Sequence, residues 1–479
     1  MNEGSPSQGP RRALAFVKAG SSAVISQVAA FALLPFLFRI YSPDDFGRWA
    51  TLQAIVLATA ALGVLRYDLA IVTEADDEQA GLLFRGCVVL GVGVTAVAVG
   101  LGGWWALRAD PGAWDFLTLG LCAAWLLTAV MNQPLQAWLL RNGRFGAAAA
   151  TIIAATAGAN LGQLVMAIWH TDHRGLIAGS ALGAMAGSLL AVAFCFATPP
   201  RWGGLSGLGA VLNQHRRFAI YSLPFTILSL ARERAPVLIL AALGTSAQVG
   251  AYSQAWRLVH IPSGLASSAF RPVVFHAAAR AGAPSVGGLV QQLIAGMALL
   301  AAPWLGVIVV EPELLFALAL GEAWREAGAF AGVLAVPALL FMLTNWLDRL
   351  LDVVHRQDVN LKLEVVSALL SVGGFAAVLW AGASLETATL VQSIALVLAY
   401  LLVLAIAYRL CGYPLRPLIG SLAAAAALAG ATGVVTAGVA SWGGGLAGLV
   451  AGAGVALVLS AAIGLRMLRP VLAAIASAK

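Results

Sequence analysis

Long apolar stretches, separated by short polar breaks, run along nearly the whole chain of 479 residues. A helix rises about 1.5 Å per residue, so roughly 20 residues cross the hydrocarbon core of a bilayer, which is about 30 Å thick. The pattern predicts an all-α, polytopic membrane protein with about fourteen transmembrane helices. The expected spans are 14–40, 47–67, 81–105, 114–138, 146–169, 176–198, 218–243, 249–270, 287–310, 328–347, 361–382, 387–408, 418–440 and 445–465.

The composition supports a membrane protein, and the distribution of charge predicts how the chain is oriented in the membrane. The chain is 61% hydrophobic and only 10% charged, far below the roughly 25% charged residues of soluble domains. If the N-terminus is cytoplasmic, 20 of the 28 Lys and Arg residues fall in cytoplasmic segments and five in outer segments. This bias predicts that both termini are cytoplasmic. The basic residues are spread along the inner loops as orientation charges, so no nucleic-acid partner is expected.

The order of the spans predicts two lobes of six helices each, with two further helices at the C-terminal end. The expected parts are an N-terminal lobe at 1–198, a cytoplasmic connecting loop at 199–217, a C-terminal lobe at 218–408, and helices 13 and 14 with a cytoplasmic tail at 409–479. A weak repeat supports the division. Ser42 and Asp45 after the first span, and Thr245 and Gln248 after the seventh, have the spacing of a helix capping box.

Two sets of regularly spaced glycines and all four cysteines are expected to have structural roles. Gly179, Gly183 and Gly187 recur every four residues, as do Gly444, Gly448 and Gly452, a spacing typical of closely packed helices. The four cysteines lie singly and show no metal-ligand spacing, so we expect small buried side chains.

A charged triplet interrupts the seventh expected span. Arg232, Glu233 and Arg234 lie past the middle of the apolar run 218–243, between Pro224 and Pro236. Each charge at mid-depth costs about 2.5–3.5 kcal/mol on insertion scales. Consecutive helical residues point about 100° apart, so the three side chains must pair with other groups or face a wet cavity.

Four segments resemble the Wzx-type O-antigen flippases, polysaccharide transporters of the multidrug/oligosaccharidyl-lipid/polysaccharide exporter superfamily. The matching segments are Tyr41–Gly47, Arg66–Asp68 followed by the acidic Glu74–Glu78, Val249–Pro262, and Gly321–Gly328. The resemblance covers roughly residues 14–410. It implies two six-helix lobes around a central cavity, located in a bacterial inner membrane. It also implies alternating access that moves an undecaprenyl-diphosphate-linked oligosaccharide to the periplasmic leaflet.

We expect no cofactor, because no ATP-binding or metal-ligand motif is evident; an H⁺ or Na⁺ gradient would drive transport. The expected partners are the lipid-linked oligosaccharide, membrane lipids and other polysaccharide assembly proteins. Two alternatives stay open at this point. One is an ion-coupled exporter of small drugs or metabolites, and the other is a membrane glycan ligase or polymerase. The short outer loops argue against an enzyme.

The candidate site residues follow from what a lipid-linked diphosphate needs. Arginine forks bind diphosphate through bidentate, charge-assisted hydrogen bonds. The candidates for binding the diphosphate or glycan are Arg232, Arg234, Arg257, Lys18 and Arg66. Those for ion coupling or ion pairing are Glu233 and Asp68, and those for a polar cavity lining are Gln27, Asn160, Gln163 and Gln392. For each, a structural role is the alternative: a locking ion pair, an orientation charge or an interhelical hydrogen bond.

Overall fold

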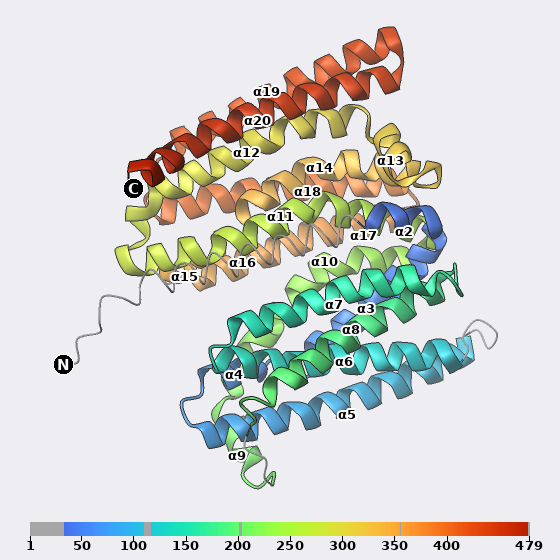
Figure 1. The fold of residues 1–479 in the computed structure, drawn as a ribbon, viewed down its shortest axis with the longest axis vertical. Helices are drawn as coiled ribbons and strands as arrows, with labels where there is room; N and C mark the ends of the chain where they lie inside the picture. Colours follow the sequence, from blue (N-terminus) through green and yellow to red (C-terminus); the bar gives the residue numbers. More distant parts are fainter. Residues whose placement is uncertain (1–32, 110–115, 201–203, 355, 478–479) are drawn as a thin grey trace. The chain divides into compact units, whose positions relative to one another are not determined.

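The computed structural model describes residues 33–109, 116–200, 204–354 and 356–477 (Figure 1). These residues form helices joined by short connections, and no strand occurs among them. Ten of the described helices are long and apolar enough to cross a membrane. The prediction of an all-α polytopic membrane protein is thereby confirmed.

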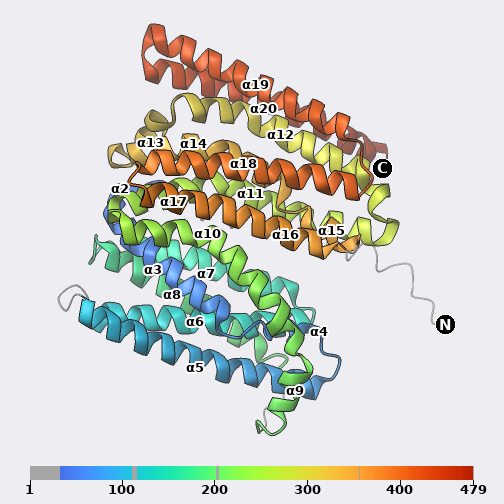
Figure 2. The same ribbon diagram turned by 180° about the vertical axis from the view of Figure 1, so that it is seen from behind.

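The chain divides into two compact units, 1–249 and 250–479. Within the first unit, α10 packs against α3 (Figure 2), and α6 packs against α8 and α5. Its helices are α2 (Leu34–Ile40), α3 (Pro43–Leu62), α4 (Asp68–Thr73), α5 (Asp77–Ala109), α6 (Phe116–Arg141), α7 (Phe145–Met166), α8 (His173–Cys195), α9 (Leu208–Gln214), the π-helix Phe218–Ser222 and α10 (Leu223–Leu243).

The second unit begins within α11 and continues to the end of the chain. In it α12 packs against α19, α20 and α14, and α14 packs against α18. Its helices are α11 (Ser246–Ala281), α12 (Gly287–Val310), α13 (Pro312–Leu320), α14 (Arg325–Thr344), α15 (Asp348–Val353), α16 (Gln357–Ala368), the π-helix Leu369–Gly373, α17 (Gly374–Trp380), α18 (Leu385–Leu410), α19 (Leu415–Gly443) and α20 (Gly445–Ser477). Short 3₁₀ turns at Ala283–Val286 and Glu322–Trp324 precede α12 and α14.

The helices follow the expected spans, with shifted ends. The second span was expected to reach residue 67, but α3 ends at Leu62. The eighth was expected at 249–270, yet α11 continues to Ala281. Of the first expected span, only the residues from 33 onward are described, and they include α2. The expected lobe boundaries stay a prediction; contacts group α10 with the first unit rather than with the helices after it.

Most glycines of the two stripes pack helices together, as their spacing predicts; the exception is Gly444, which lies in the turn between α19 and α20, where a side chain would meet no other atom. On α8, a side chain at Gly183 would overlap the backbone nitrogen of Ala159 on α7, and one at Gly179 would overlap that of Gln163. Between α19 and α20, a side chain at Gly448 would collide with the carbonyl of Thr436. In both pairs the backbones approach more closely than any larger residue allows.

The predicted capping boxes are both present, which supports the internal repeat. The Ser42 hydroxyl accepts from the Asp45 N–H at 3.3 Å, and Asp45 in return accepts from the Ser42 N–H at 3.1 Å. Thr245 and Gln248 exchange the equivalent bonds at 3.3 and 3.0 Å. The same reciprocal cap therefore begins α3 and α11.

Candidate functional site

The charged triplet lies in the middle of α10, which continues unbroken through it. Pro224 occupies the first turn of the helix, where a missing N–H costs little, and Pro236 lies inside it. A π-helix, Phe218–Ser222, leads into α10. The prolines therefore do not interrupt the helix at the charges.

The three side chains of the triplet face different surroundings. Arg232 is buried, only 7% exposed, whereas Glu233 is exposed and Arg234 is partly buried. The Arg234 Nε is buried and has no hydrogen-bond partner among the described residues. This spread matches the expected 100° between successive helical residues. A single compact ion pair cannot account for all three charges.

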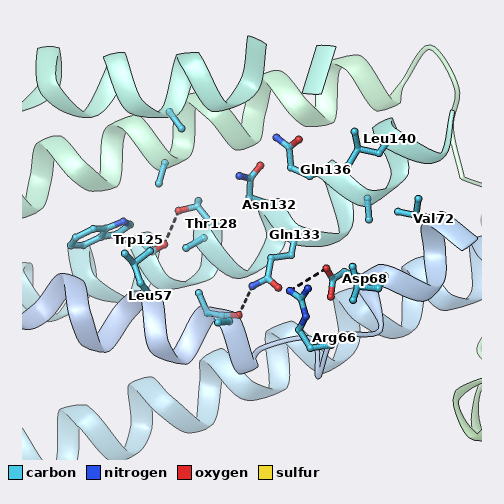
Figure 3. Close-up of a pocket in the computed structure, with 17 residues that line it drawn as sticks. Leu57, Arg66, Asp68, Val72, Trp125, Thr128, Asn132, Gln133, Gln136 and Leu140 are labelled. Atoms are coloured by element: carbon cyan, nitrogen blue, oxygen red, sulfur yellow. Dashed lines mark hydrogen bonds and ion pairs between the residues drawn. The ribbon is translucent and has the colours of Figure 1, made fainter. Parts of the chain in front are cut away.

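A pocket of about 510 Å³ opens within the first unit (Figure 3). Its walls come from α3, α4, α6, α7 and α8, together with the turn between α3 and α4. The polar side chains lining it are Arg66, Asp68, Thr128, Asn132, Gln133 and Gln136, and Trp125 adds an indole ring. Its volume falls in the range of roughly 300–1,000 Å³ that is typical of small-molecule sites.

The turn after α3 places Arg66 at this pocket, and α4, which follows it, begins there with Asp68. Leu65 and Arg66 adopt positive φ values of 49° and 63°, which are uncommon for residues other than glycine. Arg66 Nη1 lies 3.7 Å from Asp68 Oδ2, and both side chains are largely buried. The two residues are only two positions apart in the sequence, and in the structure both side chains line the pocket.

The polar face of α6 forms most of the opposite wall and was not among the predicted site residues. Asn132, Gln133 and Gln136 face the pocket together with Thr128, at the spacing of one side of a helix (Figure 3). Gln133 Nε2 donates to the carbonyl of Ala60. The signal was present in the sequence, because four polar residues recur at helical spacing inside an apolar span.

The turn between α4 and α5, next to the pocket, is held by charged side chains. Arg141 at the end of α6 donates to the carbonyls of Ile71, Glu74 and Ala75 and to Asp77 Oδ1. His215 Nε2 lies 2.7 Å from Glu74 Oε2. The Asp76 backbone N–H, which donates to Glu74 at 3.0 Å, lowers the pKa of Glu74, and the His215 ring lowers it further.

The structure places the remaining predicted residues as follows. Gln163 Nε2 donates to Ser180 Oγ at 3.1 Å, and Gln392 Oε1 accepts from the Tyr252 hydroxyl at 2.7 Å, so both make interhelical hydrogen bonds. Asn160 is buried on α7, and Arg257 is partly buried on α11. Lys18 and Gln27 lie outside the described residues. Their roles in transport stay predictions.

Metal coordination finds no support in the described part of the chain. No group of three or more His, Cys, Asp or Glu side chains there could hold a metal ion. All four cysteines are unpaired, and three of them are buried.

A family model described as "Polysaccharide biosynthesis protein" matches residues 36–329. The chain belongs to this family. The match includes the α10 triplet and every residue that lines the pocket. No curated protein sequence matches the chain.

The chain shares its fold with solved transporters. The lipid II flippase MurJ in an inward closed conformation is 10% identical, with a TM-score of 0.71, covering 96% of this chain and 100% of that one. An inward-facing multidrug resistance MATE family transporter of the MOP superfamily is 13% identical, with a TM-score of 0.56, covering 81% and 98%. A MOP superfamily transporter from Pyrococcus furiosus is 14% identical, with a TM-score of 0.50, covering 82% and 93%.

Family and fold together confirm the resemblance drawn from the four sequence segments. The chain therefore belongs to a polysaccharide biosynthesis family, and it has the fold of solved membrane transporters, among them a flippase.

Proposed function

We propose that this protein moves an undecaprenyl-diphosphate-linked oligosaccharide from the cytoplasmic to the periplasmic leaflet of a bacterial inner membrane, for a surface polysaccharide such as O-antigen. The observation that carries the proposal is the α10 triplet, with Arg232 buried in the middle of a helix inside the matched family region. Arginine is rare within membrane-spanning helices, and where it occurs it commonly marks the path of a substrate or an ion.

The chemistry of the substrate suits these side chains. A diphosphate offers several acceptor oxygens and negative charge, which an arginine fork binds through two parallel hydrogen bonds. Arg232 and Arg234 would bind the diphosphate, while Glu233 would balance the arginines or take up the driving ion. Arg257, which lies in the second unit, stays a separate candidate for the same ligand. A binding site for small cationic drugs would be richer in acidic and aromatic side chains than in arginine.

The driving force we propose is an H⁺ or Na⁺ gradient used in an alternating-access cycle of two lobes. Both termini would lie in the cytoplasm, as the charge bias of the loops predicts. The partners would be membrane lipids and the other proteins of polysaccharide assembly.

The deciding experiment measures the leaflet in which a lipid-linked oligosaccharide lies, in liposomes that contain the purified protein. An impermeant lectin or glycosidase reports how much glycan becomes accessible from one side, with and without an imposed pH or Na⁺ gradient. Gradient-dependent exposure supports the coupled flippase. Exposure that ignores both gradients contradicts the coupling. No exposure of lipid-linked glycans, combined with export of small cations from the same liposomes, overturns the proposal in favour of a drug exporter.

A further inference from the structure

The pocket of the first unit concentrates polar atoms that are buried and have no hydrogen-bond partner. Among the described residues, these atoms are Arg66 Nε, Asp68 Oδ1, Asn132 Oδ1 and Gln133 Oε1. Leaving such a group unpaired destabilises the protein, and more so when the group is charged. Buried polar atoms are rarely left without a partner, so four of them around one pocket call for a ligand that bonds to them.

The mixture of donors and acceptors restricts the chemistry of that ligand. Three of the four atoms are acceptors, and one is a charged donor. A phosphate group only accepts, so it would satisfy Arg66 and be repelled by Asp68. A metal cation would satisfy the three oxygens, but it would be repelled by Arg66, which lies 3.7 Å from Asp68 Oδ2. Neighbouring hydroxyl groups, which both donate and accept, match all four atoms.

The shape of the pocket fits the same class of ligand. Trp125 lies at one end of the labelled group, and the amides and the ion pair lie beyond it (Figure 3). The amide and carboxylate groups there can bind the hydroxyls of a sugar. About 510 Å³ is ample for a small glycan.

We infer that this pocket is a glycan subsite that binds neutral sugar units of the transported lipid through Arg66, Asp68, Asn132 and Gln133. The inference rests on the proposed function, because it assigns two parts of the same substrate to two different sites. The arginines of α10 would hold the diphosphate, and the pocket would hold sugar. Neither role depends on the chemistry of the other.

Two lipids distinguish the subsite from the diphosphate site. The probes are undecaprenyl diphosphate and undecaprenyl diphosphate that carries a neutral trisaccharide, and both are bound to the full-length protein in nanodiscs. Wild-type protein is expected to bind the trisaccharide lipid tenfold or more tightly than the bare lipid. In Asn132→Ala and Gln133→Ala this preference is expected to fall to near one, while the affinity for undecaprenyl diphosphate stays unchanged. Asn142→Ala is the matched control, since Asn142 is exposed just after α6 and does not line the pocket.

The outcomes separate this inference from the proposed function. A wild-type protein without preference for the trisaccharide lipid overturns the subsite. A preference that survives in both pocket variants overturns it as well, and the unpaired atoms then bind only water. Arg232→Ala and Arg234→Ala should weaken both lipids alike. If they weaken neither lipid, the diphosphate site is wrong, whereas the ratio between the lipids still tests the pocket.

Discussion

The Tyr252 hydroxyl donates a 2.7 Å hydrogen bond to Gln392 Oε1, and both side chains are almost fully buried. The first unit contains a counterpart, because Trp49 Nε1 donates to Ser180 Oγ at 2.8 Å. Trp49 and Tyr252 each lie seven residues after the capping residue of their helix, and Ser180 and Gln392 each lie eight residues after theirs. The repeat first seen in two short caps therefore extends to a buried brace between helices in each unit.

This brace predicts a measurable loss of stability in Tyr252→Phe. The variant keeps the ring but leaves the buried Gln392 oxygen without its donor, which costs about 1–3 kcal/mol. The measurement is the thermal unfolding of the purified protein in detergent. Tyr252→Phe combined with Gln392→Leu removes both polar partners and should recover most of the loss. Equal destabilisation in the single and double variants would show that the hydrogen bond is unimportant.

Features that depend on neighbours along one helix were predictable from the sequence. The capping boxes and the glycine stripes need only residues three or four positions apart. The structure confirms both boxes and the stripes, except for Gly444, which lies in a turn. The pocket needed more. Its formation requires α6 to face the turn at Arg66, which is a tertiary contact between segments 60 or more residues apart. Leu65 and Arg66 adopt positive φ although neither is glycine, so the local sequence does not predict the conformation of this turn.

The close approach of α7 and α8 predicts that Gly183→Ala destabilises the first unit. The added methyl group would overlap the Ala159 backbone, and such overpacking costs about 1–3 kcal/mol. Gly146→Ala on α7 is the control, since a side chain there meets open space and alanine favours the helix. The readout is the melting temperature of each variant in detergent. If Gly183→Ala has the same melting temperature as the control, α7 and α8 can move apart without a loss of stability, and the prediction is wrong.

Glu74, which accepts a hydrogen bond from the Asp76 backbone N–H and contacts His215, predicts a pH-dependent contribution to stability. The folded protein lowers the pKa of Glu74 below its ordinary value of 4.5, so the carboxylate stabilises the fold above that pH. The contribution is lost as the pH falls from 4.5 through the lowered pKa, where Glu74 takes up a proton. Glu74→Gln should therefore melt at a lower temperature than wild type at pH 7.

The comparison with Glu74→Gln is made at several pH values. The difference in melting temperature should shrink below about pH 4.5 and vanish once the wild-type carboxyl group is protonated. Glu386→Gln, which alters an exposed carboxylate in the first turn of α18, controls for general acid effects. A difference that stays constant down to pH 3 would mean that the charge of Glu74 contributes nothing.

The α10 triplet predicts a loss of transport without a loss of folding. Arg232→Ala and Arg234→Ala should each abolish glycan exposure in the liposome assay. Each variant also removes a charge that costs about 2.5–3.5 kcal/mol to place at mid-depth, so membrane insertion should not suffer. Arg232→Lys should transport weakly, because an ammonium group keeps the charge but lacks the bidentate fork. Arg48→Ala is the control, since Arg48 forms an exposed ion pair with Asp44 on α3.

Unchanged transport in both alanine variants would remove the triplet from the mechanism. Equal transport by Arg232→Lys and wild type would show that charge alone, rather than the fork, binds the diphosphate.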